Sequence, residues 1–181
     1  MLAYVFWHWP VTTGHADRAA YEEAQAGFHQ RLAGAPPPGF LRSWSFRLHT
    51  APWLKVEDAY EDWYLLEGSA ALDPLNDAAV APPARGAHNA AAAGAAGMGG
   101  LYRVHSGEPR PLSGRALWFH KPVGTSYREI YAGVDPKVTL WRRQMVLGPG
   151  PEFLAEGGPA PAGVVPIAVE RTLVTVAGQS A

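Results

Sequence analysis

The sequence predicts an α+β fold in which a β-α-β-β-α-β unit occurs twice, the second time without its second helix. A short aromatic run ending in His, one residue and Pro-Val occurs at 6–11 (FWHWPV) and again at 118–123 (WFHKPV). Strand-like and helix-like segments follow each copy in the same order. The segment 108–114 (EPRPLSG) has the composition of a linker. We therefore expect a first repeat over 1–107, this linker, and a second repeat over 115–181, folded as one compact unit.

The elements of the first repeat follow from hydrophobic patterning. A β-prone aromatic run predicts a strand over 3–9. Tyr21, Ala24, Phe28 and Leu32 lie on one helical stripe and predict a helix over 16–33, with Thr12 or Thr13 as its N-cap. Alternation, aromatic content and the helix start at Asp73-Pro74 predict the remaining elements, which are strands over 40–49, 59–67 and 101–105 and helices from 74 and over 84–96.

The second repeat is shorter than the first. Its predicted strands cover 115–121, 138–147, 152–156 and 169–176, and its predicted helix covers 125–134. A Gly- and Pro-rich loop stands where the first repeat has its second helix. This half is therefore expected to be a degenerate copy.

Composition excludes several classes of protein. The chain has 181 residues, 48% of them hydrophobic, and seven tryptophans, which is enough for a substantial core. The net charge of −1 and the absence of a dense Lys/Arg cluster argue against nucleic acid as a partner. There is no cysteine for disulfides, thiolate metal sites or nucleophilic catalysis. The apolar start lacks a basic leader and is cut short by Pro10, so we expect a soluble, cytoplasmic protein without a membrane partner.

The order of elements and the repeated aromatic-His-x-Pro segment resemble the dimeric α+β barrel superfamily in its single-chain form. The resemblance implies two ferredoxin-like units packed sheet to sheet as a pseudo-dimer, with helices outside and a cavity between the sheets. Members of that superfamily include cofactor-free oxygenases, small isomerases, haem-binding enzymes and proteins of unknown role. Such folds host many chemistries, so function has to come from the site.

The two repeated histidines are the first candidate catalytic residues. Strand alternation puts His8 on one face with Phe6, and His120 on one face with Trp118, so both are expected to point into the cavity between the sheets. An imidazole titrates near neutral pH and can act as a base. Arg42 is the candidate for stabilising an oxyanion. The alternative is that each His ends a strand and bonds a backbone carbonyl.

Further residues are predicted to bind the ligand. Tryptophans and other aromatic residues on one cavity face would form a flat apolar slot, and a buried Arg needs a carboxylate or an anionic ligand. The alternative for these arginines is a salt bridge to Asp62, Glu61 or Glu67, or an exposed position at a sheet edge. The predicted ligand-binding residues are Phe6, Trp44, Asp62, Tyr64, Arg103, Trp118 and Arg142.

The other histidines give no metal motif. The sequence has neither H-x-H nor H-E-x-x-H, so no metal ligands and no cofactor are predicted. A haem bound through His8 or His120, or a metal held by them with a carboxylate, is kept as an alternative. His88-Asn89, beside a helix break, is read as a solvated helix start that could also reach a ligand. The remaining histidines, His15, His29, His49 and His105, are expected at the surface.

These observations predict a protein that binds an aromatic or polyketide-like small molecule in the cavity between the sheets. One form of this function is a cofactor-independent enzyme of the oxygenase, isomerase or cyclase type. The alternatives are a non-catalytic ligand-binding or stress-related protein, and a haem- or metal-binding barrel. Homodimer formation is left open.

Overall fold

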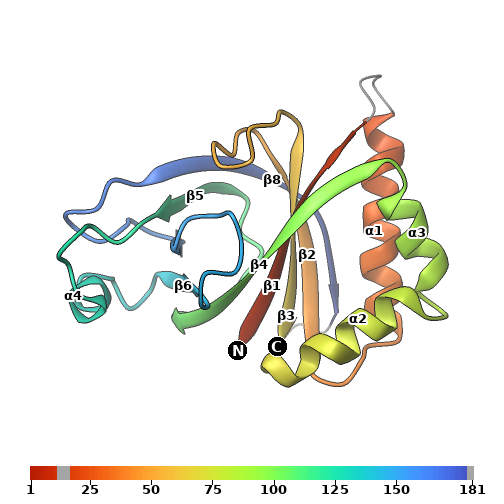
Figure 1. The fold of residues 1–181 in the computed structure, drawn as a ribbon, viewed down its shortest axis with the longest axis horizontal. Helices are drawn as coiled ribbons and strands as arrows, with labels where there is room; N and C mark the ends of the chain where they lie inside the picture. The colour runs from red at the N-terminus through yellow and green to blue at the C-terminus, as the bar shows by residue number, and fades with distance from the viewer. Residues whose placement is uncertain (12–16, 179–181) are drawn as a thin grey trace.

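The computed structural model describes residues 1–11 and 17–178 (Figure 1). Within these residues it contains eight strands and four α-helices. In chain order they are β1 (Leu2–Pro10), α1 (Arg18–Gly34), β2 (Phe40–Leu48), β3 (Ala59–Leu66), α2 (Leu72–Val80), α3 (Arg85–Ala92), β4 (Ala95–Ser106), β5 (Gly114–Phe119), α4 (Tyr127–Ala132), β6 (Thr139–Arg143), β7 (Phe153–Glu156) and β8 (Ile167–Gly178), with a single 3-10 turn, η1, at Ser69–Ala71.

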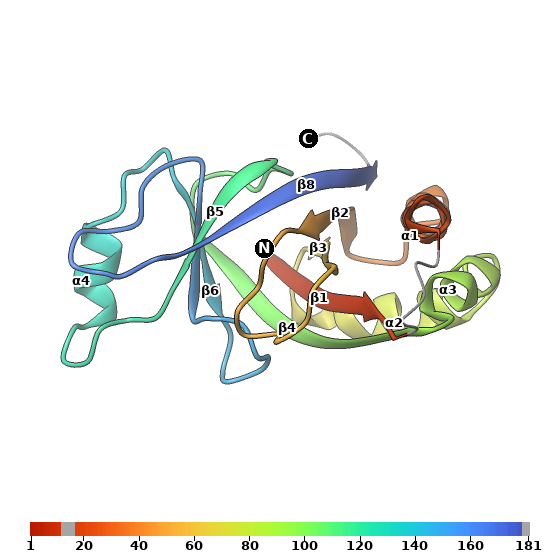
Figure 2. The same ribbon diagram turned by 90° about the horizontal axis from the view of Figure 1, so that it is seen from above.

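The strands form one closed antiparallel barrel in the order β1-β3-β2-β8-β5-β7-β6-β4. The strands of each half of the chain lie next to one another, and the halves join where β2 pairs with β8 and β4 pairs with β6. Helices α1, α2 and α3 lie together on the outside of the barrel, and α4 lies at the opposite end of the molecule (Figures 1 and 2). Among the described residues no helix is long and apolar enough to cross a membrane.

The predicted pair of ferredoxin-like repeats packed sheet to sheet is wrong, because all eight strands of the described residues belong to one closed barrel. The order of the elements along the chain is as predicted, and the described residues between β7 and β8 contain no helix. The difference lies at the strand edges. Edge strands carry unpaired backbone groups, and pairing the edges of one half with those of the other satisfies these groups. A single sheet therefore runs around the whole barrel.

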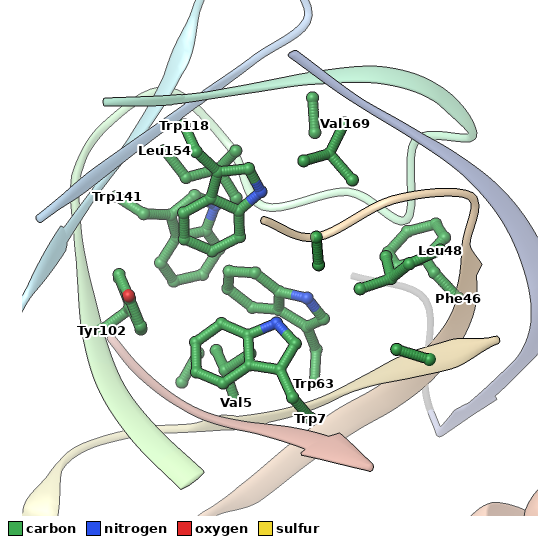
Figure 3. Close-up of a cluster of buried hydrophobic side chains, with 14 of the residues drawn as sticks. Val5, Trp7, Phe46, Leu48, Trp63, Tyr102, Trp118, Trp141, Leu154 and Val169 are labelled. Atoms are coloured by element: carbon green, nitrogen blue, oxygen red, sulfur yellow. The ribbon is translucent and has the colours of Figure 1, made fainter. Parts of the chain in front are cut away.

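Tryptophan side chains fill the barrel (Figure 3). Five of them come from strands β1, β2, β3, β5 and β6, and each is at most 1% exposed. Trp44 stacks on Trp63, the other contacts among these indoles are tilted, and the rings of Trp63 and Trp141 have centroids 4.9 Å apart. The space in which the sequence predicted a ligand cavity is therefore occupied by Trp7, Trp44, Trp63, Trp118 and Trp141.

A buried ionic cluster also lies in the barrel, formed by Glu61, Glu156 and Arg171. Arg171 Nη1 donates to Glu61 Oε1 at 3.1 Å, and its Nη2 donates to Glu156. The indoles of Trp7 and Trp63 donate to Glu61 at 2.9 and 2.8 Å. Burial raises the pKa of the Glu61 carboxyl against the opposing effect of the Arg171 charge. We call this group the Glu61–Arg171–Glu156 cluster.

The Ala- and Gly-rich segment of the chain is where the predicted elements fit least well. The predicted helix over 84–96 stops at Ala92, and β4 already begins at Ala95. Gly97 and Gly99 explain the change, because a Cβ there would lie 2.4 Å from the Phe6 ring and 2.5 Å from the Tyr4 ring. The aromatic rings of β1 lie across these glycines, which holds the segment as a strand against β1.

The N-cap of helix α1 lies about one helical turn later in the chain than predicted. The carboxylate of Asp17 accepts a hydrogen bond from the Ala19 amide at 3.1 Å and is the N-cap. Thr12 and Thr13, the predicted caps, lie outside the described residues. The helix packs Phe28, His29 and Leu32 against the outer face of the barrel, where the candidate site lies.

Candidate ligand-binding site

A cavity of about 610 Å³ lies between the outer face of the barrel and helices α1, α2 and α3. Strands β1, β3 and β4 form its floor, and the three helices form its walls. Most of the lining is aromatic or aliphatic. The lining residues are Tyr4, Phe6, His8, Gln25, Phe28, Asp62, Tyr64, Leu72, Asp73, Leu75, Asn76, Ala79, Val80, His88, Ala91, Ala92, Ala95, Ala96 and Gly97.

Strand alternation sets the floor of the cavity. Successive side chains of a strand point to opposite faces, so Tyr4, Phe6 and His8 point outward while Val5 and Trp7 fill the barrel. The register of β1 and β3 places Phe6 opposite Asp62. The rings of β1 stack in a row, with centroids 6.2 Å apart for Tyr4 and Phe6 and 5.7 Å apart for Phe6 and His8.

The helices close the cavity from outside. Gln25 of α1 is buried and donates through Nε2 to the carbonyl oxygen of Ala91 in α3 at 2.9 Å, which ties the two helices together. The Phe28 ring lies edge-on to the His88 ring, with centroids 5.5 Å apart. Asp73 and Asn76 of α2 are exposed and mark the rim.

Asp62 is the centre of a buried polar cluster on the floor, which we call the Asp62 cluster: Asp62, His8, His29 and Tyr64. His8 Nε2 lies 3.2 Å from Asp62 Oδ1, and His29 Nε2 lies 3.2 Å from Oδ2. The Tyr64 hydroxyl donates to Oδ2 at 3.0 Å. Both histidine contacts are ion-pair distances without hydrogen-bond alignment, so Oδ1 has no aligned donor among the described residues. Asp62 is 1% exposed.

The second ring nitrogen of each histidine is also engaged. His8 Nδ1 lies 2.6 Å from the hydroxyl of Tyr21, and His29 Nδ1 lies 2.7 Å from Ser43 Oγ. These contacts fix both rings in place. The His29 ring is further held by stacking on Tyr64, with centroids 5.1 Å apart.

The histidines determine the ionisation of Asp62. Burial alone would raise the pKa of its carboxyl, but the charges of His8 and His29 and their contacts outweigh burial and hold the pKa well below its usual range. Burial, with the nearby Asp62 charge, raises the pKa of Tyr64, so its hydroxyl keeps the proton that it donates. The floor of the cavity thus holds a carboxylate that stays ionised.

This ionisation predicts a loss of stability in acid. Because the pKa of Asp62 is lower in the folded chain than in the unfolded chain, its contribution is present above its ordinary pKa and is lost as the pH falls. We expect the difference in unfolding free energy between wild type and Asp62→Asn to shrink by about 1 kcal/mol per pH unit below about pH 4. Urea unfolding between neutral pH and pH 3 measures it, with Asp73→Asn at the rim as control. A difference that does not change with pH would contradict this.

Four predicted site residues line the cavity: Phe6, His8, Asp62 and Tyr64. They lie between barrel and helices, and not between two sheets as predicted. Two others, Trp44 and Trp118, are buried in the barrel. The face of β1 that carries Phe6 and His8 was predicted to point inward but points outward. Both faces of β1 are aromatic, so the sequence did not show which one is interior.

The three predicted arginines lie away from the cavity. Arg42 donates to the carbonyl oxygen of Pro109 in the linker, and its guanidinium lies 5.4 Å from the Trp44 ring centroid. Arg103 is exposed and donates to Gln144 at 3.3 Å. Arg142 donates to the Tyr131 hydroxyl at 3.1 Å and lies over the Tyr127 ring. None of the three is available to stabilise an oxyanion in the cavity.

His120 does not join His8. It is exposed and follows the last residue of β5. Its predicted equivalence with His8 requires Trp7 to match Phe119, yet the residue of β5 that shares the barrel interior with Trp7 is Trp118. The two copies of the motif are therefore out of register by one residue, which turns the corresponding side chains to opposite faces.

Sequence reasoning missed His29, which was expected at the surface and is fully buried. Its spacing carried a signal, because Gln25, Phe28, His29 and Leu32 form one buried stripe of α1. The other missed contacts are those of Tyr21 and Gln25. His88 lines the cavity, His49 and His105 are exposed as predicted, and His15 lies outside the described residues.

In the described residues, no group of three or more His, Cys, Asp or Glu side chains is arranged to hold a metal ion. The ring nitrogens of His8 and His29 lie against Asp62, Tyr21 and Ser43 inside the buried cluster, so a haem iron could reach either ring only by displacing one of these neighbours. No protein-family model, curated protein or solved structure matches this chain. The case for a function therefore depends on the chemistry of the cavity.

Proposed function

We propose that this protein binds a small, mainly apolar molecule in the cavity under α1, α2 and α3, with one polar group of the ligand at the Asp62 cluster. The observation that supports this is a cavity of about 610 Å³ whose mainly apolar lining surrounds the buried Asp62 cluster. Small-molecule sites have this composition, since apolar walls supply affinity and a few polar groups fix orientation.

Within this proposal His8 is the candidate for proton transfer. Asp62, His8 and Tyr21 form a chain in which a carboxylate lies against one ring nitrogen and a hydroxyl lies 2.6 Å from the other. A carboxylate in this position orients the ring. A reacting ligand would have to displace the Tyr21 hydroxyl from Nδ1. No observation favours the haem or metal alternative in the same way.

Binding of a neutral aromatic probe tests the proposal. We expect naphthylmethanol to bind with one-to-one stoichiometry in isothermal titration calorimetry. The variant Ala91→Trp should weaken this binding at least about tenfold, because Ala91 is buried, lines the cavity, and its replacement would occupy the ligand's space.

The matched control is Ala90→Trp, one residue earlier on α3, which is exposed and outside the lining. It should bind the probe as wild type does. If Ala91→Trp does not fold, Ala79→Trp fills the cavity from α2. Absence of binding to wild type, or equal binding by the filled and control variants, would refute the proposal.

A further inference from the structure

The charged groups around the cavity are unevenly distributed. Its lining, taken over the described residues, contains two aspartates and no lysine or arginine. Asp73 is at the exposed rim and Asp62 is on the buried floor. The arginines that the sequence placed in a ligand site form contacts elsewhere. An anionic ligand would enter this cavity without a permanent cation to meet it.

One oxygen of the Asp62 carboxylate, Oδ1, has no aligned hydrogen-bond donor among the described residues, and a ligand could supply one. Asp62 Oδ2 accepts from the Tyr64 hydroxyl, while Oδ1 has only the misaligned ring of His8 at 3.2 Å. A buried carboxylate oxygen without an aligned donor is costly, and the cost falls when a charged donor reaches it. An ammonium group carries up to three such donors and a balancing charge.

The aromatic rings beside Asp62 favour the same kind of head group. Tyr4 stacks with Tyr64 at a centroid distance of 6.0 Å, and Phe28 lies 6.2 Å from Tyr64. With Phe6, these rings border the carboxylate from β1, β3 and α1. Ring faces attract organic cations, most strongly where water is excluded. A carboxylate of the same size would meet both the ring faces and Asp62 unfavourably.

We infer that the cavity selects an organic cation, with the apolar body of an amine filling the space under the helices and its ammonium group paired with Asp62. This rests on the proposed function, because selection requires that the cavity binds small molecules. It differs from the sequence-based expectation, in which Arg42 stabilises an oxyanion on an aromatic or polyketide-like ligand. Asp62 would then determine ligand specificity in addition to its structural role, which is its contacts with His8 and His29.

Three naphthalene probes of nearly equal shape and different charge test the inference: naphthylmethylammonium, naphthylmethanol and naphthoate. In calorimetry at neutral pH, we expect the ammonium to bind about tenfold more tightly than the alcohol, and the carboxylate about tenfold more weakly. Asp62→Asn should remove most of the preference for the ammonium while the alcohol still binds.

A second pair of variants does not disturb the buried cluster. Asn76→Lys adds one positive charge at the exposed rim of the cavity, and Asp77→Asn makes the same change in net charge on α2 outside the lining. We expect Asn76→Lys to weaken the ammonium several-fold more than the alcohol, and Asp77→Asn to leave both unchanged. If Asp62→Asn does not fold, the comparison of Asn76→Lys with Asp77→Asn tests whether the cavity selects a cation.

The outcomes separate the two proposals. Equal affinity for all three probes, or preference for naphthoate, overturns charge selection and leaves ligand binding in the cavity standing. Charge selection is also overturned if neither Asp62→Asn nor Asn76→Lys changes the preference for the ammonium, because the ammonium would then be recognised outside this cavity. Failure of every probe to bind overturns the proposed function and the inference together.

Discussion

Replacing Arg171 with methionine is expected to lower the free energy of unfolding by about 3–5 kcal/mol, because it leaves buried carboxylates without their cation. Arg171 is 3% exposed and pairs with both Glu61 and Glu156 inside the barrel. Its Nε also donates to the Leu112 carbonyl oxygen at 3.1 Å, and its guanidinium lies 4.0 Å from the Phe46 ring centroid. Methionine preserves much of the packing volume but none of these polar contacts.

Chemical denaturation of wild type and Arg171→Met at neutral pH measures this loss. Arg18→Met is the matched control, because Arg18 pairs with Asp58 at 2.8 Å at the exposed surface, where such pairs contribute about 1 kcal/mol or less. Without Arg171 the pKa of Glu61 should rise further, so the stability deficit is largest at neutral pH and narrows toward about pH 4. A deficit as small as that of the control would mean that the cluster is not essential.

Trp63→Ala is expected to cost about 3–5 kcal/mol, the usual range for removing a large aromatic side chain from a core. Trp63 is 1% exposed and packs against Trp44, Trp141, Tyr102 and Trp118. Its indole also donates to Glu61. The variant therefore opens a cavity among rigid rings and removes a donor from a buried carboxylate.

Phenylalanine variants separate the two effects. Trp63→Phe keeps most of the ring and loses the donor, whereas Trp44→Phe loses an indole N–H that has no partner among the described residues. Urea unfolding should show Trp63→Phe to be less stable than Trp44→Phe by about 1.5–3 kcal/mol, the usual contribution of a hydrogen bond to a charged group, although Arg171 still donates to the same Glu61 oxygen. Equal losses would show that the hydrogen bond to Glu61 does not contribute.

Much of the local structure could be predicted from sequence. The strands β1, β2 and β3 are rich in aromatic residues and lie within one or two residues of their predicted bounds. How the strands assemble could not be predicted, because hydrophobic alternation shows that a strand has a buried face and not which strand it pairs with. The strand conformation of residues 94–100 (GAAGMGG) could not be predicted either, because it depends on the Phe6 and Tyr4 rings that β1 contributes.

The candidate site was only partly predicted, because strand alternation shows which residues share a face and not which face is interior. His8, Phe6, Asp62 and Tyr64 stand out as a mixture of polar and aromatic residues on strands, and they do line one cavity. The side of the sheet was predicted wrongly, since Trp7 on the other face of β1 is equally aromatic. His29 and its contact with Asp62 join residues that are distant in the chain, and only the packing of α1 on β3 brings them together.

The position of β8 in the chain has a consequence for biosynthesis. Barrel closure needs residues 171–178 of β8 to pair with β2, more than a hundred residues earlier, and the same strand brings Arg171 to Glu61. Until β8 emerges from the ribosome, Glu61 has no Arg171 to pair with. The edge of β2 that later pairs with β8 is also unpaired. Such late, long-range closure is typical of slow folding and prolongs the interval in which a ribosome-bound intermediate is vulnerable to aggregation.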